Sequence, residues 1–221
     1  MIKKLSKKLL NRKIFHKIEG NFILTRRSKV MIPNLNIDII YLMGVIAGDG
    51  SLNETKRSKG GYHYTFRIYA AGKKYLKLLN KLFEKNFGIE GKIIKDLRKM
   101  NTYYLVFKNA PLFFYFVING NEIGKKKRFK IPKITTKNRK YFFEYLSGLI
   151  DTDGHIAGRR IQLKQKNKEF LNKIKLLANK YHLNCTDPKV NYTNKIPYYY
   201  IRFDNKIHLR FKTNTFLNKE K

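Results

Sequence analysis

The chain carries one pattern twice, and this repeat limits what it can fold into more than any other feature. GVIAGDGSL (Gly44–Leu52) and GLIDTDGHI (Gly148–Ile156) are both short apolar stretches that lead into Asp-Gly. Three further pairs of blocks recur in the same order: MIPNL with KIPKI, FRIYAAGKKYLKLLNKLF with IQLKQKNKEFLNKIKLLA, and YYLVFKN with YYIRFDN. Self-similarity at a fixed spacing indicates a repeated structural unit. The sequence therefore predicts two copies of one fold, each roughly a hundred residues long.

The repeat divides the chain into four predicted segments. Residues 1–30 hold ten Lys and Arg residues but a single acid, Glu19, and are expected to form a basic arm. We interpret this arm as lying on nucleic acid, with a membrane-surface helix as the weaker alternative. Residues 31–117 are predicted to form the first half and residues 131–221 the second. Residues 118–130, INGNEIGKKKRFK, are rich in Gly and Lys and are predicted to be the linker.

Each half is predicted to begin with an apolar helix, over residues 38–48 in the first and 141–152 in the second. The Asp-Gly pair is expected to end that helix, because Gly favours a left-handed exit. Apolar and polar residues then alternate as in half-buried strands, and helical spacing follows. The predicted fold class is α+β, with two pseudo-symmetric αββαββα halves whose antiparallel sheets are backed by helices on one face. We expect Phe66, Ile68, Leu79, Ile161, Leu163 and Ile174 to be buried, and Arg67, Gln162 and Lys164 to be exposed.

The charge of the chain indicates the partner. Lys and Arg number 49 and Asp and Glu 15, which gives a net charge of +34. A compact fold with this charge repels itself unless a polyanion neutralises it, so nucleic acid is the expected partner. Cys185 is the only cysteine and allows no internal disulfide, which favours a reducing compartment, either a prokaryotic cytoplasm or an organelle. No apolar run approaches the length of a membrane span.

The sheet faces that helices leave uncovered are the predicted DNA-binding surfaces. A two-stranded ribbon fits the major groove, and a basic face in both halves of a strongly basic chain is typical of a nucleic-acid footprint. For any single residue, an ordinary solvated strand position is the competing interpretation. The candidates for DNA contact are Arg67, Tyr69, Gln162, Lys164, Lys166 and Arg202.

Small residues in the two apolar helices predict a close helix crossing. Gly44 and Gly48 are four apart, as are Gly148 and Thr152, and small residues at this spacing let two backbones approach. If the helices pack as a pseudo-symmetric pair, Asp49 and Asp153 meet at their ends. Two adjacent carboxylates repel unless a cation lies between them. Mg²⁺ suits such a site because it accepts one or two carboxylates together with water and phosphate oxygens.

LMGVIAGDG (Leu42–Gly50) and LSGLIDTDG (Leu146–Gly154) resemble the two LAGLIDADG motifs of single-chain homing endonucleases. The resemblance implies a monomer whose two sheets form a DNA-binding saddle. It implies that Asp49 and Asp153 are the catalytic, metal-binding acids, and that the backbone carbonyls of Gly48 and Thr152 also bind metal. At the sixth motif position the chain has Ala47 and Asp151, and Ala47 departs from the consensus.

The same resemblance implies further site residues. A polar residue is expected where the sheet meets the metal site; Gln165 fits this role and its counterpart Ala70 does not. A basic residue is expected near the attacking water, and Lys108 and Lys206 are the candidates. Lys108 aligns with Asp204, so a phosphate contact is the alternative role for this lysine.

The resulting hypothesis is a homing endonuclease that cuts a long, pseudo-palindromic site in double-stranded DNA. It is expected to use Mg²⁺, with Mn²⁺ as a substitute, and the resemblance implies short 3′ overhangs. Two alternatives stay open: a maturase that binds intron RNA, and a DNA-binding protein without cleavage activity. Both acids are present, which favours cleavage.

Overall fold

The computed structural model describes residues 2–11, 15–25, 28–124, 130–157, 160–193 and 195–203. The chain divides into two compact units, one of residues 1–39 and 49–126 and the other of residues 40–48 and 127–221. Helix α2 (Ile37–Asp49) contributes to both units, because its residues 40–48 belong to the second. The helix that carries the first repeat motif is therefore shared, whereas the strand after it is not.

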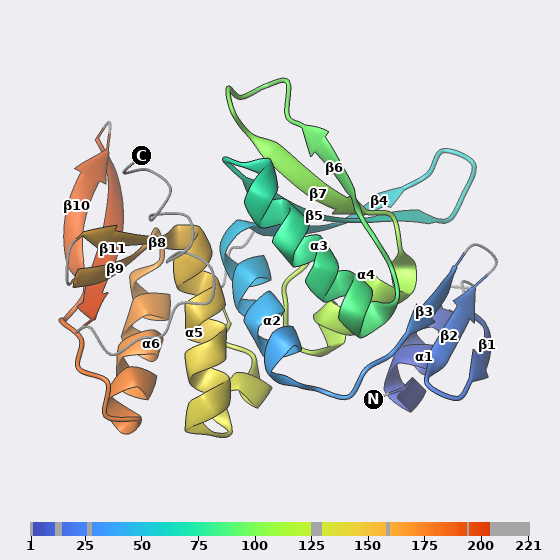
Figure 1. The fold of residues 1–221 in the computed structure, drawn as a ribbon, viewed down its shortest axis with the longest axis horizontal. Coiled ribbons are helices and arrows are strands. Elements are labelled where there is room, and N and C mark those ends of the chain that lie inside the picture. Colours follow the sequence, from blue (N-terminus) through green and yellow to red (C-terminus); the bar gives the residue numbers. More distant parts are fainter. Residues whose placement is uncertain are drawn as a thin grey trace. The chain divides into compact units, whose positions relative to one another are not determined.

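Each unit contains a four-stranded antiparallel sheet with the same strand order (Figure 1). The order is β4-β5-β7-β6 in the first sheet and β8-β9-β11-β10 in the second. In both sheets the strand after the motif helix lies at one edge, and the next strand along the chain lies beside it. The predicted α+β class and the αββαββα order are confirmed for the first half; the last helix of the second half would fall after Phe203, outside the described residues. The first repeat consists of α2, β4 (Gly50–Lys56), β5 (Tyr62–Ala70), α3 (Lys73–Phe87), β6 (Lys92–Lys95), β7 (Tyr103–Phe107) and α4 (Ala110–Ile118). The second consists of a short 3-10 helix (Lys133–Thr136), α5 (Arg139–Asp153), β8 (Gly154–Ala157), β9 (Arg160–Gln165), α6 (Lys168–Lys180), β10 (Lys189–Thr193) and β11 (Ile196–Phe203).

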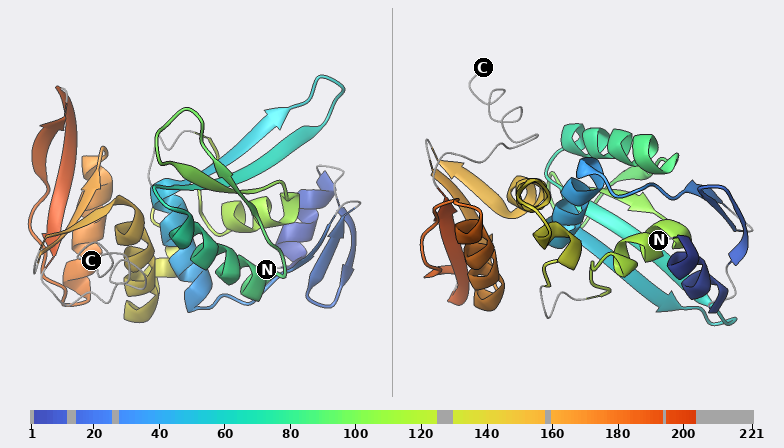
Figure 2. Two further views of the ribbon diagram at one scale, coloured as in Figure 1. Left: turned by 45° about the horizontal axis from the view of Figure 1, so that its top comes forward. Right: turned by 90° about the horizontal axis from the view of Figure 1, so that it is seen from below.

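The alternation in the strands produces one buried and one open face in each sheet. In the first sheet the ring of Phe66 lies 5.5 Å from that of Phe83 in α3 and 5.6 Å from that of Phe116 in α4, so both helices cover the same face (Figure 2). All six residues predicted to be buried are buried, and Lys164 is exposed as predicted. Arg67 and Gln162 are half-buried instead, because neighbours on the open face cover part of each side chain.

The described residues of the predicted basic arm form secondary structure. Helix α1 (Ile2–Asn11) buries Leu5 and Leu9 completely and packs on α4. A small antiparallel sheet follows, in the order β1 (Phe15–Glu19), β2 (Phe22–Thr25) and β3 (Lys29–Met31). Lys3, Lys4, Lys7 and Lys8 of α1 are exposed, so the helix has one apolar and one basic face.

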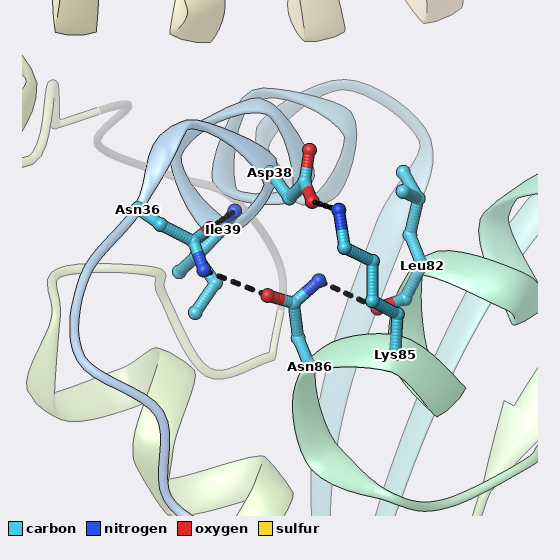
Figure 3. Close-up of polar contacts among 6 residues, drawn as sticks. All are labelled: Asn36, Asp38, Ile39, Leu82, Lys85 and Asn86. Atoms are coloured by element: carbon cyan, nitrogen blue, oxygen red, sulfur yellow. Dashed lines mark hydrogen bonds and ion pairs between the residues drawn. The ribbon is translucent and has the colours of Figure 1, made fainter.

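A polar network fixes the start of α2 against α3 (Figure 3). The side-chain oxygen of Asn36 accepts a hydrogen bond from the Ile39 backbone amide at 3.0 Å and so caps the helix. The side-chain nitrogen of Asn36 donates to the side-chain oxygen of Asn86 at 2.8 Å. Lys85 donates to the largely buried carboxylate of Asp38 at 2.8 Å. Helix α5 begins in the same way, since Asn138 accepts from the Tyr141 amide at 2.8 Å. Both motif helices therefore have a defined first turn.

The exit from the motif helices differs from the prediction. Gly154 has φ −89° and ψ 164°, which is extended, and it is the first residue of β8. The predicted left-handed exit is wrong because the chain passes directly from helix to strand. Gly154 is needed for space instead: a Cβ there would lie 2.5 Å from the carbonyl oxygen and 2.6 Å from the side chain of Ile150.

Candidate active site and nucleic-acid interface

The motif helices α2 and α5 cross at their glycines. A Cβ at Gly44 would collide with the carbonyl oxygen of Tyr145 and lie 3.0 Å from the amide nitrogen of Leu149. A Cβ at Gly148 would collide with the carbonyl oxygen of Tyr41, the residue that corresponds to Tyr145 in the repeat. The two backbones are in direct contact through matching positions. The close crossing predicted from the spacing of small residues is confirmed.

The acid of the second motif lies beside this crossing. Asp153 is the last residue of α5, and Gln165 at the end of β9 donates a hydrogen bond from Nε2 to its Oδ2. A Cβ at Gly48 of α2 would collide with the Thr152 side chain and lie 3.1 Å from Oδ2 of Asp153. Four predicted site residues, Gly48, Thr152, Asp153 and Gln165, are thus neighbours within the second unit. The fifth, Asp49, is the next residue after Gly48 along the chain.

A hydrogen bond between the motif helices accompanies the crossing. The Tyr41 hydroxyl of α2 donates to Oδ2 of Asp151 in α5 at 2.7 Å. Asp151 occupies the sixth motif position, where the first motif has Ala47, which offers no side-chain acceptor. This contact therefore has no carboxylate counterpart in the other half, so the helix pair is symmetric in backbone but not in polar contacts.

The donor atoms here suit a hard divalent cation. The candidate ligands are the carboxylates of Asp49 and Asp153 and the carbonyl oxygens of Gly48 and Thr152, all of which are oxygen donors. Both carbonyls lie in last helical turns, where backbone oxygens can take partners from outside the helix. In the part of the chain that the structure describes, no three or more His, Cys, Asp and Glu side chains form a group that could hold a metal ion. Mg²⁺ needs only one or two carboxylates.

The open face of the second sheet carries the predicted basic residues next to tyrosines. In the register of β9 and β11, Lys164 lies opposite Tyr200 and Gln162 opposite Arg202, so all four share one face. The ammonium of Lys164 lies 5.4 Å from the ring of Tyr198, and the guanidinium of Arg202 lies 5.2 Å from that of Tyr200. Lys166, directly after β9, is exposed.

The open face of the first sheet has the same character. The guanidinium of Arg67 lies 5.4 Å from the ring of Tyr104, and the ring of Tyr69 lies 5.6 Å from that of Tyr104. Aromatic rings next to cations suit contact with a phosphate backbone and with base faces. The DNA contacts predicted from the sequence did not include Tyr104, Tyr198 and Tyr200. In YYYIRF, Tyr198 and Tyr200 are spaced two residues apart and in step with Arg202, and this period of two was the available signal.

Three further positions were considered for the site from the sequence: Lys108, Ala70 and Lys206. Lys108 is exposed and directly follows β7, whose last residue Phe107 pairs with Phe66 in the middle of β5. Ala70 ends β5 and is the register counterpart of Gln165, as the alignment of the repeats predicted. Lys206 lies outside the described residues. The catalytic roles of both lysines stay predictions.

Comparisons with known proteins agree with this architecture. Residues 140–214 match the family described as LAGLIDADG-like domain. The second half of the chain is therefore similar to a LAGLIDADG-like domain. This match contains the second motif, Asp153 and Gln165, so the resemblance expected from LSGLIDTDG is confirmed there. None of the curated proteins compared with the chain matches it.

Solved structures extend the likeness to both halves. A mesophilic variant of the homing endonuclease I-DmoI has a TM-score of 0.62 and 18% identity, covering 83% of this chain and 100% of its own. An I-DmoI variant in complex with its nicked target DNA and Mn has a TM-score of 0.58 and 20% identity, covering 77% and 90%. I-WcaI bound to its DNA recognition sequence has a TM-score of 0.50 and 16% identity, covering 93% and 82%. The chain therefore shares the fold of the I-DmoI structures.

Proposed function

We propose that this chain is a divalent-metal-dependent endonuclease that cuts double-stranded DNA at a long, specific, pseudo-palindromic site. The observation that carries the proposal is the arrangement at the helix crossing. Asp153 is held there by Gln165 and lies beside Gly48, after which the chain continues to Asp49. A duplicated acid at the ends of two touching helices suits one phosphodiester cleavage per strand. The I-DmoI and I-WcaI structures, whose fold this chain shares, are described as complexes with DNA.

Asp49 and Asp153 would hold Mg²⁺, with Mn²⁺ as a substitute, together with the carbonyls of Gly48 and Thr152. When bound, such an ion activates water and stabilises the charge that develops on the phosphate. Gln165 acts on Asp153, since its amide N–H donates to one carboxylate oxygen and so fixes the orientation of the acid. Asp49 and Asp153 each end a motif helix, so little reorganisation of either helix end would be needed during cleavage.

The open sheet faces would read the DNA in the major groove. Arg67, Lys164 and Arg202 supply charge, and the tyrosines beside them supply flat apolar surface. Phosphate contacts set the register on the duplex, whereas contacts to base edges set specificity. Binding should weaken with salt with a log–log slope of about −0.9 per neutralised phosphate. The chain would act as a monomer and would leave short 3′ overhangs.

Cleavage of a randomised duplex library by the purified chain tests this function. Incubation in Mg²⁺ should yield cleaved molecules that share one sequence, and incubation in EDTA should yield none. On the recovered duplex, Asp49→Asn and Asp153→Asn should each reduce double-strand cleavage by about 10³-fold or more, because a ligand carboxylate is lost. Glu169→Gln, on the exposed surface of α6, is the matched control and should cut like the wild type. Full double-strand cleavage by either aspartate variant, or binding without any cleavage by the wild type, would contradict the proposal.

A further inference from the structure

The connection between β6 and β7 is a tightly held turn. The Asp96 amide donates to the Thr102 carbonyl at 2.8 Å and closes the turn. Inside it, the Lys99 amide donates to the Asp96 carbonyl at 3.2 Å, and the Arg98 amide donates to the Asp96 side chain at 3.1 Å. Asn101 takes a left-handed conformation with φ 53°, which Asn tolerates better than most residues. The backbone of residues 96–102, which we name the β6–β7 turn, is therefore well defined.

A bidentate ion pair within the turn makes it rigid. Arg98 donates from Nε and Nη2 to the two carboxylate oxygens of Asp96, both at 2.9 Å. The Asp96 side chain is only 4% exposed, so a buried carboxylate and a planar guanidinium form a rigid pair. Hydrogen bonding to Asp96, and then interaction with the Tyr69 hydroxyl, raises the pKa of Arg98.

Two large apolar side chains project from the braced turn into solvent. Leu97 is 90% exposed and Met100 is 91% exposed, more than any other large apolar residue of the described chain. Lys99 lies between them and is also exposed. Leu and Met are among the side chains that DNA-bending proteins insert between base pairs, and nearby Lys or Arg contact the adjacent phosphates. A rigid turn with apolar side chains next to a cation matches that use.

The position of the turn places it at the catalytic end of the first sheet. Lys95, just before the turn, pairs with Tyr103, which pairs with Ala70 at the end of β5. Asp49 lies at the same end, because Gly50 pairs with Ile68. Three strand spacings of about 4.8 Å separate the strands β4 and β6, so the turn is a few base-pair rises from this acid. The second sheet continues at this end as a paired ribbon beyond Val190 and Tyr199, with Tyr192 64% and Ile196 55% exposed, so a compact braced turn with Leu97 and Met100 belongs to the first sheet.

We propose that the β6–β7 turn is a wedge that inserts Leu97 and Met100 at a base step of the target DNA, near the cleavage site and in the half-site that the first sheet reads. This inference rests on the proposed function. The Asp96–Arg98 pair keeps the turn rigid while base pairs are unstacked, and Lys99 contacts the neighbouring phosphate. This turn would therefore kink the DNA on the side read by the first sheet.

The experiment uses the duplex recovered by cleavage selection with the wild-type chain. A 2-aminopurine scan across the duplex reports unstacking, and fluorescence resonance energy transfer between its ends reports bending, both in Ca²⁺ or EDTA to prevent cleavage. The test variant is L97A/M100A. The matched control is L176A, which truncates a 68% exposed leucine on α6. Because the altered side chains are exposed, folding should be unaffected, and circular dichroism checks this.

The wild type should brighten 2-aminopurine at a base step near the cleavage site and shorten the end-to-end distance. The double variant should lose the brightening and bind about tenfold more weakly, since unstacking and bending support the remaining contacts. A mismatch at that step, which removes the cost of unstacking, should restore its affinity to within about threefold of the wild type. L176A should behave as the wild type. If the wild type cuts the duplex but the double variant bends it equally, the wedge alone is wrong; a wild type that cuts no DNA overturns the wedge and the proposed function together.

Discussion

The two repeats share a backbone plan but differ where the chemistry is proposed. The strand orders correspond, both motif helices are capped by Asn, and Gly44 and Gly148 meet the opposite helix in the same way. The differences are the pair Ala70 and Gln165, the sixth motif residues, and the connection between the last two strands of each sheet. Backbone contact demands equivalent residues on both sides, whereas polar contacts at the site do not.

This contrast indicates how a duplicated protein can acquire an asymmetric function. The helix crossing tolerates no side chain at its glycines, so the two copies stay alike there. Around the crossing, the second copy supplies a hydrogen-bond donor to Asp153, Gln165, and an acceptor for Tyr41, Asp151, where the first copy has Ala70 and Ala47. An asymmetric DNA target needs such differences, because each half then meets a different sequence.

The largest expected effect comes from breaking the symmetric crossing. Gly44→Leu and Gly148→Leu each force a side chain into the opposite backbone, which should cost roughly 3 kcal/mol or more of unfolding free energy. Chemical denaturation monitored by circular dichroism measures this. Gly72→Ala is the control, since its Cβ would meet nothing within 4 Å, and should change stability by less than about 1 kcal/mol. Equal losses of unfolding free energy in all three variants would show that close packing at the helix crossing does not limit stability.

Removing the asymmetric donor should affect one strand of the DNA. Gln165→Ala deletes the hydrogen bond to Asp153, and a bond to a charged group contributes about 1.5–3 kcal/mol. We expect cleavage of one strand to slow by about tenfold or more, so that nicked DNA accumulates. Strand-specific end labels measure both rates, with Asn172→Ala on the exposed surface of α6 as the control. Equal slowing of both strands would argue against a separate acid for each strand.

The contact between Tyr41 and Asp151 should give a smaller effect. In a double-mutant cycle of Tyr41→Phe and Asp151→Ala, we expect a coupling energy of about 1 kcal/mol in unfolding, because the 2.7 Å hydrogen bond is lost in either single variant. Tyr41→Phe combined with Glu169→Gln should be additive, since Glu169 is an exposed residue paired with Lys173. Additivity in both cycles would mean that this bond does not stabilise the helix pair.

The smallest expected effect is a local dependence on pH in the β6–β7 turn. The hydrogen bond from Arg98 holds the pKa of Asp96 below its ordinary value of 3.8. The stabilisation is therefore complete above that value and is lost only as the pH falls through the lower pKa of the folded state. Amide exchange at Asp96 should stay slow down to about pH 4 and then rise, and R98M should raise the carboxyl pKa toward the ordinary value in side-chain NMR. An unchanged pKa in this variant would contradict the ion pair.

Much of the fold was predictable because hydrophobic periodicity and internal repetition are local properties of a sequence. The alternation around Phe66 and Ile161 specified which faces are buried, and both motif helices lie where the apolar runs predicted. The fold of residues 2–31 was not predicted, since Leu5 and Leu9 are apolar positions whose partner, α4, lies far away in sequence. The predicted left-handed conformation of Gly154 was wrong for a related reason. Glycine is required there because a Cβ would collide with Ile150, and not because of its own φ.

The candidate site likewise has features that the sequence predicted and contacts that only the structure showed. The sequence alone determined the two Asp-Gly motifs, the polar residue Gln165 and the basic open faces, because each is a matter of residue type and spacing. Only the tertiary structure decided that Gln165 donates to Asp153, that Tyr41 bonds to Asp151, and that tyrosines lie against the basic side chains. Those contacts join residues far apart in the chain, and their existence depends on strand register and helix crossing, which three-dimensional packing fixes.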